Sequence, residues 1–158
     1  MGMSGKIIAF IVPILSLTAG SALAGQATTN FAVTATVVAT CGVSATPLAF
    51  GDYTGSTNVD QTSTISVTCT TGTDYTVALN DGNNASGGVR RMVNGGSNYL
   101  AYEMYSDAGR TTAWNATATV AGTGTGIAQS LTVYGRVASG QNVPAGAYSD
   151  TVQVTVSY

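Results

Sequence analysis

The last ten residues of the sequence, SDTVQVTVSY, constrain the fold more than any other stretch. Val152, Val154, Val156 and Tyr158 alternate with polar residues, which is the pattern of a β-strand with one buried and one solvated face. No turn and no returning strand follow, and the segment has none of the charges, prolines or bulges that protect the edges of natural sheets. We therefore expect a further strand, from this chain or from another, to cover this edge.

Most of the remaining sequence consists of short β-branched segments separated by turns rich in Gly, Asn and Ser. The predicted strands cover residues 30–45, 63–70, 74–80, 98–107, 129–137 and 151–158. No segment has a sustained helical period, no repeat is visible, and the strand count comes out near seven. This organisation predicts one all-β domain, an antiparallel β-sandwich.

The first 24 residues have the features of a secretory signal peptide. Lys6 precedes a short apolar run, and Ala22 and Ala24 form an Ala-x-Ala cleavage pattern. We expect cleavage after Ala24, with Ala27 as the second choice. The apolar run is too short for a membrane-spanning helix. The remaining chain would enter the periplasm and then the cell surface, with four arginines against seven acidic residues and a net charge of −3.

The two cysteines, Cys41 and Cys69, would reach an oxidising compartment if the chain is exported. A disulfide is then the expected state, and two buried thiols are the alternative. Two cysteines without any histidine do not favour a zinc site.

The composition also argues against several classes of function. The absence of histidine removes Ser-His-Asp and Cys-His catalysis and most metal sites, and the only glutamate is Glu103. We therefore expect neither an enzyme nor a bound metal or other cofactor. The acidic balance and the scattered arginines argue against nucleic acid binding.

The aromatic residues have two interpretations. They could pack in the core and along the edges of a sandwich, or they could form a stacking platform for carbohydrate. The second interpretation describes a small secreted carbohydrate-binding module. The residues concerned are Tyr99, Tyr102, Tyr105, Trp114, Tyr134, Tyr148 and Tyr158.

A second uncharged amphipathic segment lies near the start of the exported chain. Phe31, Val33, Ala35 and Val37 alternate with small polar residues or alanine. This strand could fill the open edge of another copy, and head-to-tail contacts of that kind produce filaments. It could equally fold back onto its own sheet. The sequence leaves both arrangements open, because both bury the same strand.

Several stretches together resemble one known family. They are FAVTATVVATCGVSATPLAFGDY, TSTISVTCTTGTDYTVALNDG, YLAYEMYSD, VYGRV and PAGAYSDTVQVTVSY. From Phe31 onward the chain resembles the spore coat U domain family, which includes subunits of archaic chaperone–usher (Csu-type) pili. The resemblance implies an incomplete immunoglobulin-like sandwich that lacks its last strand. A periplasmic chaperone lends a strand to the open groove, and at the outer-membrane usher the N-terminal segment of another subunit replaces it.

The resemblance also implies roles for individual residues. Residues 25–36 would form the donor-strand segment and residues 37–158 the sandwich domain. The donor positions would be Phe31, Val33, Ala35 and Val37, and one side of the acceptor groove would be Val152, Val154, Val156 and Tyr158. Cys41 and Cys69 match the family disulfide. The implied function is a structural subunit of an adhesive, biofilm-supporting fibre, with neighbouring subunits, chaperone and usher as partners. A coat or matrix protein that completes its own sheet is the alternative.

Overall fold

A computed structural model describes residues 24–158, so the predicted signal peptide lies almost wholly outside the described residues. The chain divides into two units, one ending at Ala35 and one covering Thr36–Tyr158, and the second contains all the strands. The eight strands of the described residues are β1 (Cys41–Ala45), β2 (Val59–Cys69), β3 (Asp74–Leu79), β4 (Arg90–Val93), β5 (Tyr99–Tyr105), β6 (Val120–Thr123), β7 (Gln129–Val137) and β8 (Val154–Ser157).

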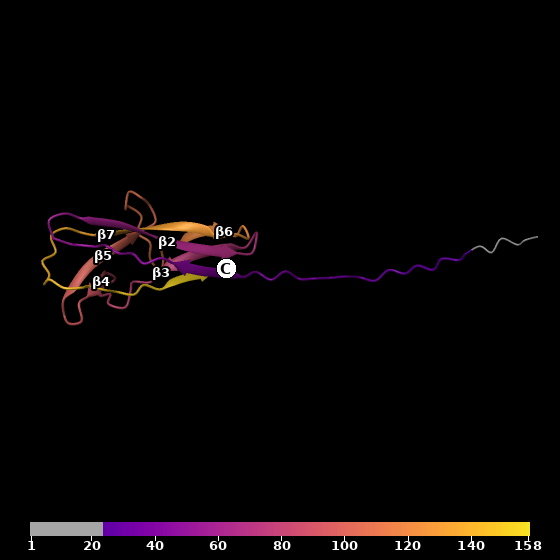
Figure 1. The fold of residues 1–158 in the computed structure, drawn as a ribbon, viewed down its shortest axis with the longest axis horizontal. Helices are drawn as coiled ribbons and strands as arrows, with labels where there is room; N and C mark the ends of the chain where they lie inside the picture. Colours follow the sequence, from indigo (N-terminus) through magenta and orange to yellow (C-terminus); the bar gives the residue numbers. More distant parts are fainter. Residues whose placement is uncertain (1–23) are drawn as a thin grey trace, which may run out of the picture. The chain divides into compact units, whose positions relative to one another are not determined.

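The strands form two antiparallel sheets (Figure 1). The order is β1-β2-β7-β5-β4 in the five-stranded sheet and β6-β3-β8 in the three-stranded sheet. The longest pairing joins β2 and β7, from Val59 opposite Val137 to Val67 opposite Gln129. No helix occurs within residues 24–158, and so none there could cross a membrane. The predicted all-β antiparallel sandwich is confirmed.

The core lies between the two sheets and follows from the alternation in the sequence. Every second residue is buried in β3, in β5 and in β2 from Ser63 onward, because side chains of a strand alternate between its two faces. The buried apolar residues are Ile65, Val67, Cys69, Tyr75, Val77, Leu79, Leu100, Tyr102, Met104, Trp114, Val133 and Val137. The inward set of β5 is thus Leu100, Tyr102 and Met104.

The predicted strands agree with the structure in the centre of the sandwich and differ at its margins. β7 spans the predicted 129–137, and β3 falls within the predicted 74–80. β4 and β6 were not predicted. Residues 30–40, predicted as strand, belong to no strand in this chain, and β1 begins at Cys41. A strand needs a partner strand for its backbone N–H and C=O groups, and none of the strands in residues 24–158 pairs with this segment.

The predicted disulfide is present. Cys41 and Cys69 are bonded and lie directly opposite each other at one end of the β1–β2 pair. The bond joins the first residue of an edge strand to the last residue of β2, whose other edge pairs with β7.

One part of the interior is filled by two large side chains, which we call the Trp114–Arg90 cluster. Trp114 is 1% exposed and its indole N–H donates to the Val77 carbonyl at 2.9 Å. Arg90 is 2% exposed and its guanidinium donates to the carbonyls of Asn80 and Trp114 at 2.8 and 3.0 Å. Buried in this way, the indole has no face open to a sugar, so a carbohydrate platform built on Trp114 is excluded.

Candidate functional site

The three-stranded sheet is narrower than the five-stranded sheet, and part of the space between them is not filled by side chains. A cavity of about 390 Å³ lies there, and we call it the groove. Its floor is the inner face of the five-stranded sheet. The floor residues come from four strands of that sheet: Ser63 of β2, Val133 of β7, Tyr102 and Met104 of β5, and Met92 of β4.

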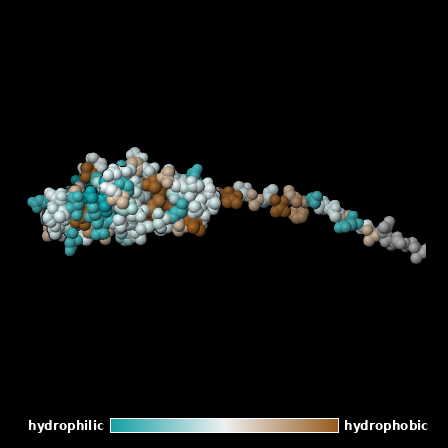
Figure 2. Space-filling model, turned by 90° about the horizontal axis from the view of Figure 1, so that it is seen from above, coloured by the Kyte–Doolittle hydropathy of each residue, from teal (hydrophilic) through white to brown (hydrophobic). Residues whose placement is uncertain are grey.

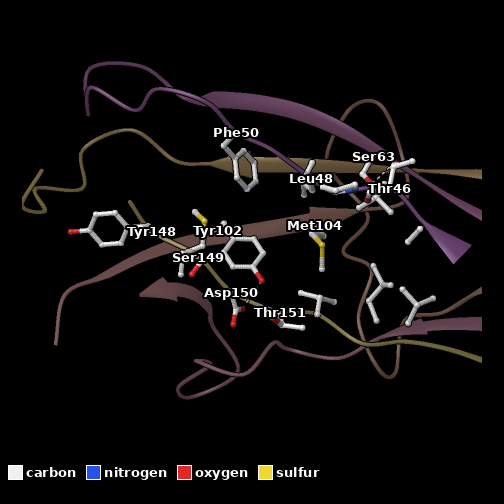
Figure 3. A pocket seen from close by; sticks show the side chains of 17 residues that line it. Thr46, Leu48, Phe50, Ser63, Tyr102, Met104, Tyr148, Ser149, Asp150 and Thr151 are labelled. Atoms are coloured by element: carbon white, nitrogen blue, oxygen red, sulfur yellow. Dashed lines mark hydrogen bonds between the residues drawn. The ribbon is translucent and has the colours of Figure 1, made fainter. Parts of the chain in front are cut away.

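One wall of the groove is the segment that follows β1. Figure 3 shows Leu48 and Phe50 on one side of Tyr102 and Met104. Leu48 and Phe50 lie directly over Gly135 of β7, where a Cβ atom would come within 2.6 Å of Leu48 and 2.9 Å of Phe50. The sequence places glycine at this strand position because the wall approaches the sheet backbone so closely.

The other wall is the segment that leads into β8. Figure 3 shows Asp150 and Thr151 there, on the side opposite Leu48 and Phe50, with Tyr148 at one end of the groove. Ser149 pairs with Val93 of β4 through two backbone hydrogen bonds of 2.9 and 3.0 Å. β8 itself pairs only with β3 among the described strands. The second edge of β8 therefore offers unpaired N–H and C=O groups beside an apolar groove.

The predicted groove residues differ in their surroundings. Val152 and Val154 line the groove. Val156 packs against the core but does not line the groove. Tyr158 is exposed. The alternation that starts before β8 thus places Val152 and Val154 at the groove, whereas Val156 and Tyr158 lie outside its lining.

Asp150 ties one wall to the floor and was not identified from the sequence. Its carboxylate accepts hydrogen bonds from the Tyr102 hydroxyl at 2.7 Å, the Asn84 side-chain amide at 2.9 Å and the Asn83 backbone N–H at 3.0 Å. Burial, and then the hydrogen bond to the Asp150 carboxylate, raise the pKa of Tyr102 above its usual range. The tyrosine therefore remains a neutral donor, and the segment before β8 is held in place without being a regular strand.

The predicted donor positions lie in a segment without secondary structure. Phe31 and Val33 are 85% and 83% exposed, and Ala35 and Val37 are also exposed. In Figure 2 the segment carries several hydrophobic residues at its surface. Isolated apolar residues on a surface are ordinary, but a short uncharged run of them at alternate positions is a recognition pattern for a sheet edge.

The chemistry available at the groove is that of peptide binding. Its lining is mainly apolar, with a few hydroxyls and one carboxylate that is already hydrogen-bonded. Within residues 24–158 no three His, Cys, Asp or Glu side chains are grouped so that they could hold a metal ion. A groove of this kind beside an unpaired strand edge suits an extended apolar segment, which adds to the sheet and places alternate side chains in the groove.

Comparison with known proteins identifies the family. Residues 27–155 match the model of the Spore Coat Protein U domain. The chain belongs to the Spore Coat Protein U domain family. Protein U of Myxococcus xanthus is 36% identical over 175 residues, which cover 96% of both chains. The family resemblance seen in the sequence is confirmed.

The fold is similar to that of a solved pilus protein. The structure is the CsuC–CsuE chaperone–tip adhesion subunit pre-assembly complex from archaic chaperone–usher Csu pili of Acinetobacter baumannii. The TM-score is 0.62 at 23% identity. The match covers 78% of this chain and 40% of that chain. Similarity at this level is a similarity of fold.

Proposed function

We propose that the exported chain is a structural subunit of a chaperone–usher surface fibre, and that subunits join by donor-strand exchange. The N-terminal segment of one copy would occupy the groove of the next copy. The observation that carries this proposal is the combination of an apolar groove beside the unpaired edge of β8 with an exposed, alternating apolar segment in the same chain.

The physical chemistry supports a durable association. Each large apolar side chain transferred from water into the groove stabilises the complex by about 1.5–3 kcal/mol before the entropic cost of ordering the segment. Phe31, Val33 and Val37 are all exposed and available for this transfer. The edge of β8 would gain backbone hydrogen bonds in addition. Because the occupant fills a gap in another fold, we expect dissociation to be slow.

The proposal includes further partners. An open apolar groove is an aggregation hazard, so a periplasmic chaperone that covers it before assembly would protect the subunit. The similar CsuC–CsuE structure is titled a complex of a chaperone with a tip adhesion subunit, which supports a chaperone partner here. An outer-membrane usher, a role in adhesion and biofilm, and signal cleavage after Ala24 complete the proposed pathway.

A second candidate function has its own support. The 36% identity to Protein U over nearly the full length of both chains suits a coat or matrix protein of the same fold. In that case the N-terminal strand of each molecule would complete its own sheet. The exported chain would then be a stable monomer that needs no chaperone.

Size-exclusion chromatography with light scattering on the oxidised chain from Gly25 onward separates the two candidates. We expect heat-resistant polymers from this chain. Phe31→Asp should abolish them, because a carboxylate would enter an apolar groove. Thr34→Asp is the matched control, since Thr34 lies on the opposite face of an alternating strand, and it should polymerise. A stable monomer with a high melting temperature would contradict the fibre function and support the second candidate.

A further inference from the structure

Apart from the proposed donor positions, the three most exposed large apolar side chains lie at one end of the sandwich, which we call the N-terminal pole. Val38, Ile127 and Tyr158 are 70%, 71% and 62% exposed. They come from three distant segments: the residues before β1, the β6–β7 loop and the residue after β8. Figure 1 shows the C-terminus and the end of β6 on this side.

Backbone pairing fixes these segments at the same end. The β6–β7 loop is held to the β2–β3 turn by hydrogen bonds from Gly126 N–H to the Cys69 carbonyl at 3.0 Å and from Gly72 N–H to the Gly124 carbonyl at 2.8 Å. The end of β8 lies beside the start of β3, with Ser157 opposite Thr76. All of these segments surround the β2–β3 turn.

The chain that enters β1 is held to that same turn. Thr70 N–H donates to the Thr40 carbonyl at 3.0 Å, and Thr40 N–H donates to the Thr70 hydroxyl at 3.2 Å. The Thr70 hydroxyl also lies 3.5 Å from the Val38 carbonyl. Residues 38–40 are therefore part of the pole and do not form a free tether.

The side chains of the pole carry no charge. The segments that form it, residues 36–40, 70–73, 124–128 and 157–158, contain no charged side chain. Asp74, which follows the β2–β3 turn, accepts a hydrogen bond from the Thr123 hydroxyl at 2.7 Å. A cluster of exposed apolar side chains without charged neighbours is typical of a protein–protein contact.

The short connection between the proposed donor strand and β1 determines what can reach this pole. Only Val38, Ala39 and Thr40 separate the last proposed donor position, Val37, from Cys41. The four Cα–Cα steps from Val37 to Cys41 span about 14 Å at most. A donor strand seated up to Val37 in one copy would therefore bring the next copy against the N-terminal pole of its owner.

The direction of the donor strand identifies the opposing surface. Every strand pair in the sandwich is antiparallel, and β8 runs from the Tyr148–Asp150 side toward the pole. A donor strand added antiparallel to β8 would leave the groove near Tyr148 and Asp150. The pole of one copy would then meet the opposite end of the next copy, which is a head-to-tail contact that does not close on itself.

We propose that the N-terminal pole is a second contact surface between consecutive copies of this chain, so that neighbouring domains are packed against each other as well as linked by a strand. This inference depends on the proposed fibre function. It specifies a partner, a second copy, and the residues that would be buried in the contact: Val38, Ile127 and Tyr158.

The test measures how fast copies dissociate from preformed polymers of the exported chain, and how tightly a free peptide of residues 26–37 binds. Peptide binding is measured on the full exported chain with Phe31→Asp, whose groove should be vacant. We expect Ile127→Asp to raise the dissociation rate about tenfold, because a carboxylate would be buried in the apolar contact. Peptide affinity should not change, because the peptide fills the groove without bringing a pole. Tyr158→Ser should act in the same direction.

Thr132→Asp is the matched control. It adds the same charge to an exposed threonine in the middle of β7, away from both ends, and should leave both measurements unchanged. An Ile127→Asp polymer that dissociates at the wild-type rate would overturn the second contact while leaving donor-strand exchange intact. A loss of peptide affinity in Ile127→Asp would overturn it as well, since the effect would then act through the groove. If Phe31→Asp polymerises normally, the fibre mechanism fails and the second contact fails with it.

Discussion

The Trp114–Arg90 cluster and the groove are two solutions to the same packing problem. Both occupy the space between a five-stranded and a three-stranded sheet. In the cluster, a buried indole and a buried guanidinium fill the space and donate to the carbonyls of β3 and its neighbours. In the groove, a floor of similar apolar side chains faces a cavity of about 390 Å³.

The difference shows that the cavity does not result from poor packing throughout this fold. The same chain supplies large side chains and satisfied hydrogen bonds in one region and leaves the other region open, where the wall formed by Leu48 and Phe50 lies so close to β7 that Gly135 is required. Natural interiors are packed to the density of organic crystals, so a cavity of this size in an otherwise well-packed domain calls for an occupant. The following changes test that contrast.

The largest effect should come from emptying the filled region. We expect Trp114→Ala to lower the free energy of unfolding by about 3–5 kcal/mol, because it creates a cavity and removes the indole hydrogen bond to the Val77 carbonyl. Urea unfolding followed by circular dichroism measures this. A loss below about 1 kcal/mol would mean that the cluster is as loosely packed as the groove, and the contrast would fail.

Truncating a side chain on the groove floor should lower the free energy of unfolding by less than Trp114→Ala does, unless the groove is occupied. Met104 borders the cavity, so Met104→Ala removes fewer contacts than a substitution in a filled core and should cost about 2 kcal/mol, the low end for this type of change. Ile65→Ala, in the filled core, is the comparison and should cost more. Both are measured on the Phe31→Asp chain with and without the donor peptide. The cost of Met104→Ala should rise when the peptide is bound, and an unchanged cost would place the peptide elsewhere.

The hydrogen bond between Tyr102 and Asp150 should contribute less again. Tyr102→Phe should cost about 1–2 kcal/mol at neutral pH, because Asp150 keeps its bonds to Asn83 and Asn84.

The same substitution should change stability in alkali. The pKa of Tyr102 is raised on folding, so its contribution is complete below the ordinary tyrosine value of 10.0 and is lost as the pH rises above that value, where only the unfolded chain ionises. Tyr102→Phe should remove this part of the alkaline loss. Thermal unfolding from pH 8 to 11 measures it, and parallel curves for the two proteins would contradict the assignment.

The smallest effect should come from the outer face, away from both regions. Arg136 holds Asp60 through two bonds of 2.7 Å, and this hydrogen bonding lowers the pKa of the Asp60 carboxyl. The resulting stabilisation is present above the ordinary value of 3.8 and is lost as the pH falls below it. Asp60→Asn should cost less than about 1 kcal/mol at pH 7, as is usual for exposed ion pairs. Asp60→Asn should also reduce the loss of unfolding free energy between neutral and acid pH, measured by urea unfolding at several pH values. A loss at pH 7 as large as that of Trp114→Ala would contradict this prediction.

The central strands could be predicted from the sequence because their own alternation determines them. β7 and β3 are β-branched segments whose buried and exposed residues alternate within the segment. β4 could not be predicted, because its four residues begin with two arginines and Arg90 is buried only by virtue of carbonyls supplied by Leu79, Asn80 and Trp114. β6 contains a glycine over which Tyr75 lies, a contact that no local pattern reveals.

The groove was predictable in part for the same reason. The alternation of residues identified Val152 and Val154, and Tyr102 and Met104 are among the alternate, inward-facing residues of β5. The wall made by Leu48 and Phe50 has no periodicity, and its position depends on a glycine in a strand more than 80 residues away. Asp150 resembles an ordinary turn residue until the loop at Asn83 and Asn84 is brought to it. Features that depend on two distant segments are those that sequence patterns do not contain.

The Cys41–Cys69 bond also has a mechanical consequence. Tension applied to the N-terminal segment reaches the sandwich at β1, an edge strand of five residues that could be peeled away one hydrogen bond at a time. The disulfide bypasses this weak path, because it transmits the load covalently from the first residue of β1 to the last residue of β2. β2 is paired along most of its length with β7, so the force is spread in shear over many hydrogen bonds at once. A domain connected in this way can bear a pulling load through its N-terminus without unravelling from its edge.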